Sequence, residues 1–289
     1  MRFPHLAQRM FNTPLAITAD KAEIIMAALA DRLGIAHLFH ADGTRLEAPR
    51  IKTGEDMWGD PIYETPYYLV QGVAVIPVQG TVVHRAVSLR PRSGMTGYNS
   101  ILLAVLSALQ DKDAKAIMLD IDSPGGEVSG CFDLVDTIAA ARGQKPIWSI
   151  VDDCACSAAY AIASAADRII LPRTGKVGSI GVIWMHVDWS RALNQAGIAV
   201  TFVTYGDRKT DGWPELPLAA EARERIQAQI NQTGELFVQT VARNRNMTQK
   251  AVRETQAATY QGAAGAQIGL VDAIMAPDEA FARLLASLP

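Results

Sequence analysis

Two short stretches of this 289-residue chain carry residue types that could support acyl transfer. In the first, Ser123 to Gly126 reads Ser-Pro-Gly-Gly, and consecutive glycines can turn backbone N–H groups toward a ligand oxygen. In the second, Ser157 stands between Cys156 and Ala158 among very small residues, which would let a substrate backbone approach its hydroxyl. Each stretch also has a plain structural interpretation, a tight strand-to-helix turn for the first and a helix N-cap for Ser157.

A serine hydroxyl needs a base, and Lys209 and His186 are the candidates. Lys209 lies in a loop after an apolar run, where Trp213 could shield its amine from water. A lysine acts as a base only when its amine is neutral, which apolar surroundings favour. The hydroxyl of Ser179 could hold that amine in line, and His186 follows Ser157 at a spacing that also allows a Ser/His/Asp triad. The plain alternatives are a solvated lysine, a turn serine and a structural histidine.

Two classes other than peptidases also remain open on these residues. Acyl-CoA hydratases and isomerases use paired backbone N–H groups too, and in this chain they would need Glu127 as the acid or base. A glutamate at a helix start more often complements the helix dipole. A non-catalytic scaffold protein is the second class, and a serine-reactive probe on Ser157 would separate it from an enzyme.

The elements expected around these residues alternate between strand and helix, which predicts parallel βαβ units and an α/β fold. A helix is expected from Asn99, another from about Glu127 directly after Gly126, another over Ser157 to Ala166, one near Trp189 to Gln195, and a long one from Ala219 to about Arg245. Strands are expected over Val73–Val78, Ala116–Ile121, Pro146–Val151, Arg168–Leu171, Ile180–Met185 and Ala199–Thr204.

The first third of the chain has a different composition. A capping-box pattern at Asp20 and Glu23 predicts a short amphipathic helix that ends near Gly34. From about His40 to Pro66 the residues become polar and loop-forming, which predicts a linker. We therefore divide the chain into an N-terminal extension and linker, residues 1–66, and a catalytic domain, residues 67–289.

The amino-acid composition limits the expected binding partners and the expected cellular compartment of the protein. The formal charge is −3, from 27 basic and 30 acidic residues, and no basic run occurs, so nucleic acid is not expected as a partner. The three cysteines, Cys131, Cys154 and Cys156, include one C-x-C pair without a second pair, so free thiols are expected rather than a zinc site. No signal peptide or membrane-spanning run is recognised, which predicts a soluble, cytoplasmic protein.

In this order the motifs resemble the signal-peptide-peptidase-A family of serine peptidases, family S49, over roughly residues 70 to 275. The matching features are Ser-Pro-Gly-Gly at 123–126, Ser-x-x-Tyr at 157–160, Gly-Ser-Ile-Gly-Val at 178–182, Lys209 before Thr210, and the closing pattern from Gln261 to Asp272. The resemblance implies a crotonase-like or caseinolytic-protease-like α/β core of repeated ββα units with an N-terminal helical extension.

The same resemblance implies roles for individual residues. Ser157 would be the nucleophile, Lys209 the base and Ser179 the hydrogen-bond partner of the lysine. The backbone N–H groups of Gly126 and Ala158 would form the oxyanion hole, supported by Gly125. No cofactor and no metal are implied. This chain departs from the family in having Ala158 after the nucleophile, where glycine is frequent.

The N-terminal stretch from Arg9 to Ile17 resembles the start of soluble phage members that process proteins during head assembly. That resemblance implies capsid and scaffold proteins as substrates, action in the host cytoplasm or the prohead interior, no membrane partner, and a ring-like homo-oligomer. The alternatives are a soluble bacterial peptide-degrading member of the same family or a crotonase-type enzyme. The missing membrane segment argues against signal peptides as substrates.

Overall fold

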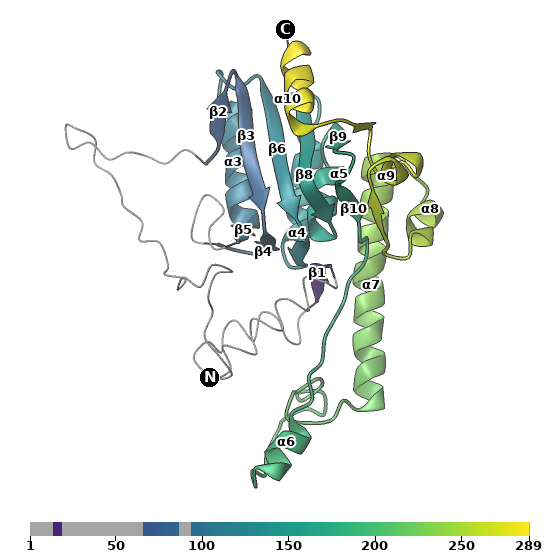
Figure 1. Ribbon diagram of the computed structural model, residues 1–289. Coiled ribbons are helices and arrows are strands. Elements are labelled where there is room, and N and C mark those ends of the chain that lie inside the picture. Colours follow the sequence, from purple (N-terminus) through teal and green to yellow (C-terminus); the bar gives the residue numbers. More distant parts are fainter. Residues whose placement is uncertain (1–13, 19–65, 87–93, 289) are drawn as a thin grey trace, which may run out of the picture.

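The computed structural model describes residues 14–18, 66–86 and 94–288 (Figure 1). The helix predicted after Asp20 and nearly all of the linker predicted over 40–66 lie outside these ranges. The division of the chain at residue 66 therefore stays a prediction.

Among the described residues, eight strands form the main sheet. They are β2 (Tyr68–Val70), β3 (Val73–Gln79), β6 (Ala116–Ser123), β8 (Ile147–Cys156), β9 (Arg168–Leu171), β10 (Lys176–Gly178), β11 (Thr259–Gln261) and β12 (Ala273–Ile274). The order is β11-β10-β8-β6-β3-β2, with β9 beside β8 and β12 beside β9. The central strands β3, β6 and β8 are parallel, as the alternating pattern predicted.

A smaller sheet within the described ranges has four strands and lies across the carboxyl ends of the central strands (Figure 1). Its strands are β1 (Leu15–Ile17), β4 (Thr81–Val83), β5 (Met95–Gly97) and β7 (Gly125–Glu127), in the order β1-β7-β4-β5. Strand β4 continues β3, and β7 continues β6. In chain order β7 leads to α4, and β4 leads through β5 to α3, so the predicted ββα units of a crotonase-like core are confirmed.

The described helices are α3 (Tyr98–Gln110), α4 (Cys131–Ala140), α5 (Ala158–Ser164), α6 (Ser190–Gln195), α7 (Ala220–Arg245), α8 (Gln249–Glu254), α9 (Ala263–Gln267) and α10 (Pro277–Ala286). The predicted helices at 99, 157–166, 189–195 and 219–245 are all present within one or two residues of these bounds. No helix in the described part of the chain combines the length and the apolar character that crossing a membrane requires.

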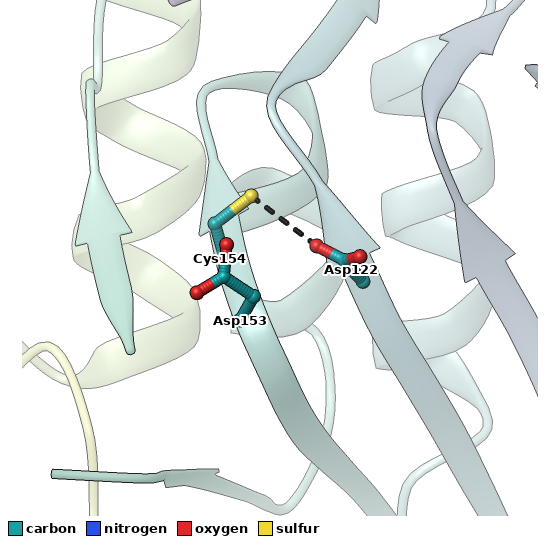
Figure 2. A group of neighbouring side chains, drawn as sticks. All are labelled: Asp122, Asp153 and Cys154. Atoms are coloured by element: carbon teal, nitrogen blue, oxygen red, sulfur yellow. Dashed lines mark hydrogen bonds between the residues drawn. The ribbon is translucent and has the colours of Figure 1, made fainter. Parts of the chain in front are cut away.

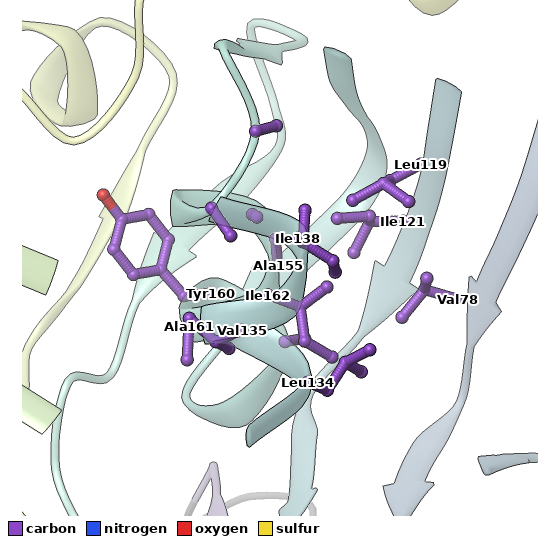
Figure 3. Close-up of a cluster of buried hydrophobic side chains, with 14 of the residues drawn as sticks. Val78, Leu119, Ile121, Leu134, Val135, Ile138, Ala155, Tyr160, Ala161 and Ile162 are labelled. Atoms are coloured by element: carbon purple, nitrogen blue, oxygen red, sulfur yellow. The ribbon is translucent and has the colours of Figure 1, made fainter. Parts of the chain in front are cut away.

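Both faces of the main sheet are covered. Alternate residues of its strands point to opposite faces, so the central strands contribute side chains to two cores. Ala74, Ile76 and Val78 of β3 face the main core, which also takes in the buried sides of α3, α4 and α5. Figure 3 shows the centre of this core, where Leu134 of α4 and Ile162 of α5 lie near the end of β6. The opposite face of the sheet packs against α10 in a second, smaller core.

The carboxyl end of α7 is tied to the main sheet by polar contacts. The guanidinium of Arg245 donates two hydrogen bonds of 2.9 Å to Asp272, which also accepts the N–H of Ile169 at 2.7 Å. Burial alone would raise the pKa of the Asp272 carboxyl, but these hydrogen bonds hold it below its usual value. Nearby, the buried hydroxyl of Tyr160 donates to the carbonyl oxygen of Leu270 at 2.8 Å.

Three of the predicted elements differ from the structure. The helix expected from Glu127 begins at Cys131, because the residues directly after Pro124 form β7 instead. Residues 180–185 form no strand, and Ile183 makes only an isolated bridge with Leu15. Residues 199–204 also form no strand. The first run meets β1 at that single residue, and the second run has no neighbouring strand among the described residues, whereas a strand requires a partner along its length.

The second of these runs belongs to an extension, residues 187–219, that projects away from the main sheet together with α6 and the first turns of α7 (Figure 1). An ion pair of 2.8 Å between Arg225 and Asp211 and a hydrogen bond of 2.7 Å from Trp189 N–H to Pro214 hold its segments together. Most of its side chains are exposed.

Candidate active site

Ser157 lies at the sharp turn between β8 and α5. Its backbone has φ 55° and ψ −122°, which is strained for a residue with a Cβ atom. The N–H of Ser157 donates to Gly178 O at 2.8 Å, and the N–H of Ala161 donates to Ser157 O at 3.0 Å. The Ser157 side chain is buried, and its hydroxyl donates to Gly181 O at 3.4 Å. A strained serine at a strand-to-helix turn is typical of a catalytic nucleophile.

Strand β7 brings the two predicted glycines against Ser157. Gly125 has φ +106°, and a Cβ atom there would lie 2.9 Å from the Cβ of Ser157. A Cβ atom at Gly126 would overlap the carbonyl oxygen of Val82, so only glycine fits this close approach. The N–H of Gly125 donates to the hydroxyl of Ser123 at 3.2 Å, so it is Gly126 that fits the role of oxyanion donor.

The other predicted oxyanion donor, Ala158, is the first residue of α5. The first N–H groups of a helix have no partner inside the helix, so the N–H of Ala158 is open to a ligand on the Ser157 side. All seven residues of α5 are buried, and they are small except for Tyr160 and Ile162. The tight packing of this helix fixes the position of the Ala158 N–H relative to the Ser157 hydroxyl.

Ser179 follows β10 directly after Gly178, whose carbonyl oxygen accepts the N–H of Ser157. The N–H of Ser179 donates to Ala258 O at 2.9 Å, and its backbone also has a positive φ of 53°. A cavity of about 750 Å³ lies beside this turn, and its lining includes Cys156, Ser179 and Gly181. The structure therefore brings the turn of Ser179 next to Ser157, whose own side chain is fully buried and does not line this cavity.

Lys209 lies apart from this cluster within one chain. It is exposed in the extension, in a loop whose own shallow cavity is lined by residues 205–209. This loop sits with α6 at the far end of the extension in Figure 1. The structure does not bring Lys209 to Ser157 in a single chain, and its role as base stays a prediction.

The residues of the two rival interpretations also lie elsewhere. His186 stacks on Trp184 with ring centroids 5.8 Å apart, and among the described residues neither of its ring nitrogens has a hydrogen-bond partner. The carboxylate of Glu127 accepts the N–H of His84 at 2.7 Å. Glu127 is the last residue of β7, whereas Gly125 is the first. Neither the His186 nor the Glu127 side chain contacts the Ser157 hydroxyl through a hydrogen bond in the described structure.

Acidic groups and a thiol border the cavity at the ends of β6 and β8. Asp122, Asp153 and Cys154 offer ligand atoms within 4.8 Å of one another, and the Cys154 thiol lies 3.5 Å from a carboxylate oxygen of Asp122 (Figure 2). Burial and the neighbouring Cys156 and Asp122 raise the pKa of the Cys154 thiol to about 12. Exposed acidic groups of this kind are common without a cation, so we assign no metal to this group. Burial also raises the pKa of the Asp120 carboxyl, and Asp152 and Asp122 raise it further.

Sequence reasoning missed the position of one segment at this site. Strand β1 pairs with β7, so residues 15–17 lie directly against the two glycines. The only local signal was a short apolar run after Pro14, and a pairing between residues more than a hundred positions apart has no local signature.

Two family models match the chain. One described as Peptidase family S49 matches residues 139–288, and one described as Clp protease matches residues 76–176. The first match begins in α4 and extends to the C-terminal helix α10, so it includes Ser157 and Lys209. The second match includes Gly125, Gly126 and Ser157.

Known proteins similar to the chain include two phage proteins. It is 37% identical over 287 residues to the head-tail preconnector protein GP5 of Enterobacteria phage P21, across 98% of this chain and 57% of that protein. It is 37% identical over 282 residues to capsid assembly protease C of Escherichia phage lambda, across 96% of this chain and 64% of that protein. A putative protease of Methanocaldococcus jannaschii is 30% identical over 176 residues, across 61% of this chain and 57% of that protein. The chain thus spans less than two thirds of the length of each of these relatives.

Proposed function

We infer that this chain, which belongs to peptidase family S49, is a serine endopeptidase with Ser157 as its nucleophile. The observation that carries the proposal is the strained backbone of Ser157, at a turn that faces a pair of glycines. Strain of this kind persists only where the surrounding structure holds it, and it is concentrated at catalytic sites.

In the proposed reaction, Oγ of Ser157 forms a bond to the carbonyl carbon of the scissile peptide while its proton moves to the neutral amine of Lys209. The N–H groups of Gly126 and Ala158 stabilise the negative charge that develops on the carbonyl oxygen. The C–N bond then breaks, and the departing amine takes the proton from the lysine. Water next gives a proton to the same lysine and attacks the carbonyl carbon of the acyl-enzyme. The ester C–O bond then breaks, and the lysine returns this proton to Oγ of Ser157, which releases the carboxylic acid and regenerates the free serine. The hydroxyl of Ser179 orients the amine in both steps.

We place the Lys209 of a neighbouring copy at the site, because within one chain Lys209 lies on the projecting extension. The extension exposes large apolar side chains: Val203 is 97% exposed, and Trp189, Ile198, Tyr205 and Trp213 are also exposed. Exposed apolar groups gathered on one surface mark an interaction site. A second copy of the chain that covers this surface would bury them, and the same contact would supply apolar surroundings for the lysine. A homo-oligomer is therefore part of the proposed mechanism.

The proposed substrates are capsid and scaffold proteins of a phage head. The support is similarity over nearly the whole chain to proteins that are named for capsid assembly and for the head-tail preconnector. The enzyme would act in the host cytoplasm or inside the prohead. Protein substrates also suit the 750 Å³ cavity, which residues from five separate segments of the chain line.

The test is complementation between two inactive variants. Ser157→Ala and Lys209→Met are each expected to abolish cleavage of a casein-like substrate while the thermal melt stays close to that of the wild type. Co-expressed, the two variants should regain activity, because mixed assemblies contain sites in which both residues are intact. Arg208→Met, on the same loop, is the matched control and should keep most of the activity.

Two outcomes would change the assignment. Loss of activity in His186→Ala together with activity in Lys209→Met would replace the Ser/Lys dyad with a triad. Absence of recovery in the co-expressed pair, with both variants folded and assembled, would mean that Lys209 does not act from a neighbouring copy.

A further inference from the structure

Strand β1 is paired on both of its edges, as a bound extended peptide would be. On one edge it runs antiparallel to β7, with Ala16 opposite Gly126 and Ile17 opposite Gly125. On the other edge, Leu15 exchanges two backbone hydrogen bonds of 2.9 Å with Ile183. Peptide ligands commonly bind by adding a strand to an exposed sheet edge in this way.

The pairing places Ala16 at the proposed oxyanion hole. The N–H of Thr18 donates to Pro124 O at 3.1 Å, and hydrogen-bonded pairs recur at every second residue of an antiparallel ladder. The next such pair is therefore Ala16 with Gly126, which directs the carbonyl group of Ala16 toward β7. A Cβ atom built on Gly125 would overlap this carbonyl oxygen, and the same atom would lie 2.9 Å from the Cβ of Ser157. The Ala16 carbonyl oxygen and the side chain of Ser157 thus lie on the same side of Gly125.

We propose that residues 15–17 are an internal substrate mimic that fills the peptide-binding groove between β7 and Ile183. The proposal rests on the peptidase function proposed above. The edge of β7 can pair with one strand at a time, so a substrate must displace β1 before Ser157 can attack it. An extended peptide then binds antiparallel to β7 in the register that β1 occupies, and the free chain is latent while β1 remains in place.

The buried side chains of β1 define the class of peptide that fits. Ala16 is 2% exposed and belongs to the main core, so the position next to the scissile bond has room for a small side chain only. Leu15 and Ile17 are also buried, and Ile17 lines the 750 Å³ cavity together with Thr18. The groove accordingly takes an extended apolar segment with alanine or a residue of similar size before the cleaved bond.

The experiment uses full-length chains and a biotinylated peptidyl phosphonate with Leu-Ala before the phosphorus, which labels an active serine covalently. Leu15→Pro removes the N–H that bonds Ile183, and Ala16→Asp places a charge in the buried position of β1. Both variants should be labelled at Ser157 at least fivefold faster than the wild type. Leu69→Pro, in the edge strand β2, is the matched control and should be labelled at the wild-type rate. A free peptide with the sequence of residues 14–18 should slow the labelling of both β1 variants, whereas a scrambled peptide should not.

A second measurement needs no variant in β1. In the wild type, hydrogen exchange of the Leu15 amide should be slow in the free chain and fast after the phosphonate has filled the groove. Equal labelling rates in all chains, or an amide that stays protected in the labelled protein, would overturn the internal mimic while leaving Ser157 as the nucleophile. Absence of labelling in every chain, matched by absence of cleavage, would overturn the proposed function itself.

Discussion

Replacing Ser157 with glycine should stabilise the fold while abolishing cleavage. The backbone of Ser157, at φ 55° and ψ −122°, is strained for a side chain with a Cβ atom but accessible to glycine. Strain of this kind costs about 1–3 kcal/mol, and the extra freedom of glycine in the unfolded chain offsets about 0.4–1 kcal/mol of the relief. From the middle of each range, the expected net gain in the free energy of unfolding is therefore about 1 kcal/mol.

Ser157→Ala is the matched comparison because alanine keeps the Cβ atom and loses the same hydroxyl. Both variants give up the 3.4 Å hydrogen bond to Gly181, so that loss cancels in the difference between them. The assay is urea unfolding at one protein concentration, followed by circular dichroism, with peptidase activity measured on the same samples. Neither variant should cleave the substrate, and the glycine variant should unfold at the higher urea concentration.

A control shows what glycine does at an unstrained site. Ala228 is exposed within α7, and Ala228→Gly should lower the free energy of unfolding by about 1 kcal/mol, which is the ordinary cost of glycine in a helix. If Ser157→Gly is also less stable than Ser157→Ala, the backbone at Ser157 is not strained. The observation that carries the proposed nucleophile would then be lost.

Three further substitutions test how the site is held. Gly126→Ala should abolish activity and cost about 3 kcal/mol or more in urea unfolding, because the new methyl group overlaps the Val82 carbonyl. Tyr160→Phe should cost about 1–3 kcal/mol in the same assay, because it leaves the buried carbonyl of Leu270 without its donor. Asp272→Asn should cost about 1 kcal/mol at neutral pH, because Arg245 is buried but Asp272 is partly exposed to solvent. Since the pKa of Asp272 is lowered by folding, its contribution is present above the unfolded value of about 3.9 and lost as pH falls through the folded value. The asparagine variant should therefore show a flatter acid limb, and an unchanged limb would contradict the role of this carboxylate.

The parts of the site that the sequence predicted are those with a local physical cause. Gly125 and Gly126 are needed where the backbone approaches other groups closely, and such positions are visible as a glycine pair after an apolar strand. Ser157 is flanked by alanine and cysteine because α5 is buried all round. The strands β3, β6 and β8 are apolar over most of their length because both faces of the sheet are covered.

The parts that could not be predicted depend on partners distant in the sequence. The helix expected from Glu127 starts later because Gly126 is already paired with Val82 on one side and Ala16 on the other. Residues 199–204 have the composition of a strand, but the described part of the chain offers them no strand to pair with. The sequence context made Lys209 a candidate base, but its distance from Ser157 within one chain depends on the extension, which has no local signature in the sequence.

Two of the proposals, the base from a neighbouring copy and the substrate mimic β1, both control the activity of Ser157. If Lys209 reaches the site from a neighbouring copy, a free chain lacks the base that Ser157 needs. If β1 fills the groove, the same chain also lacks access to its substrate, because the edge of β7 is taken. These conditions are physically independent, since one depends on the extension and the other on the N-terminal strand. The strained backbone of Ser157 is independent of both conditions. It positions the hydroxyl in the same way whether or not the base and the substrate are present. In such a site the nucleophile and the oxyanion donors are in position in every chain. Cleavage begins only after the chains have assembled and a substrate has displaced β1.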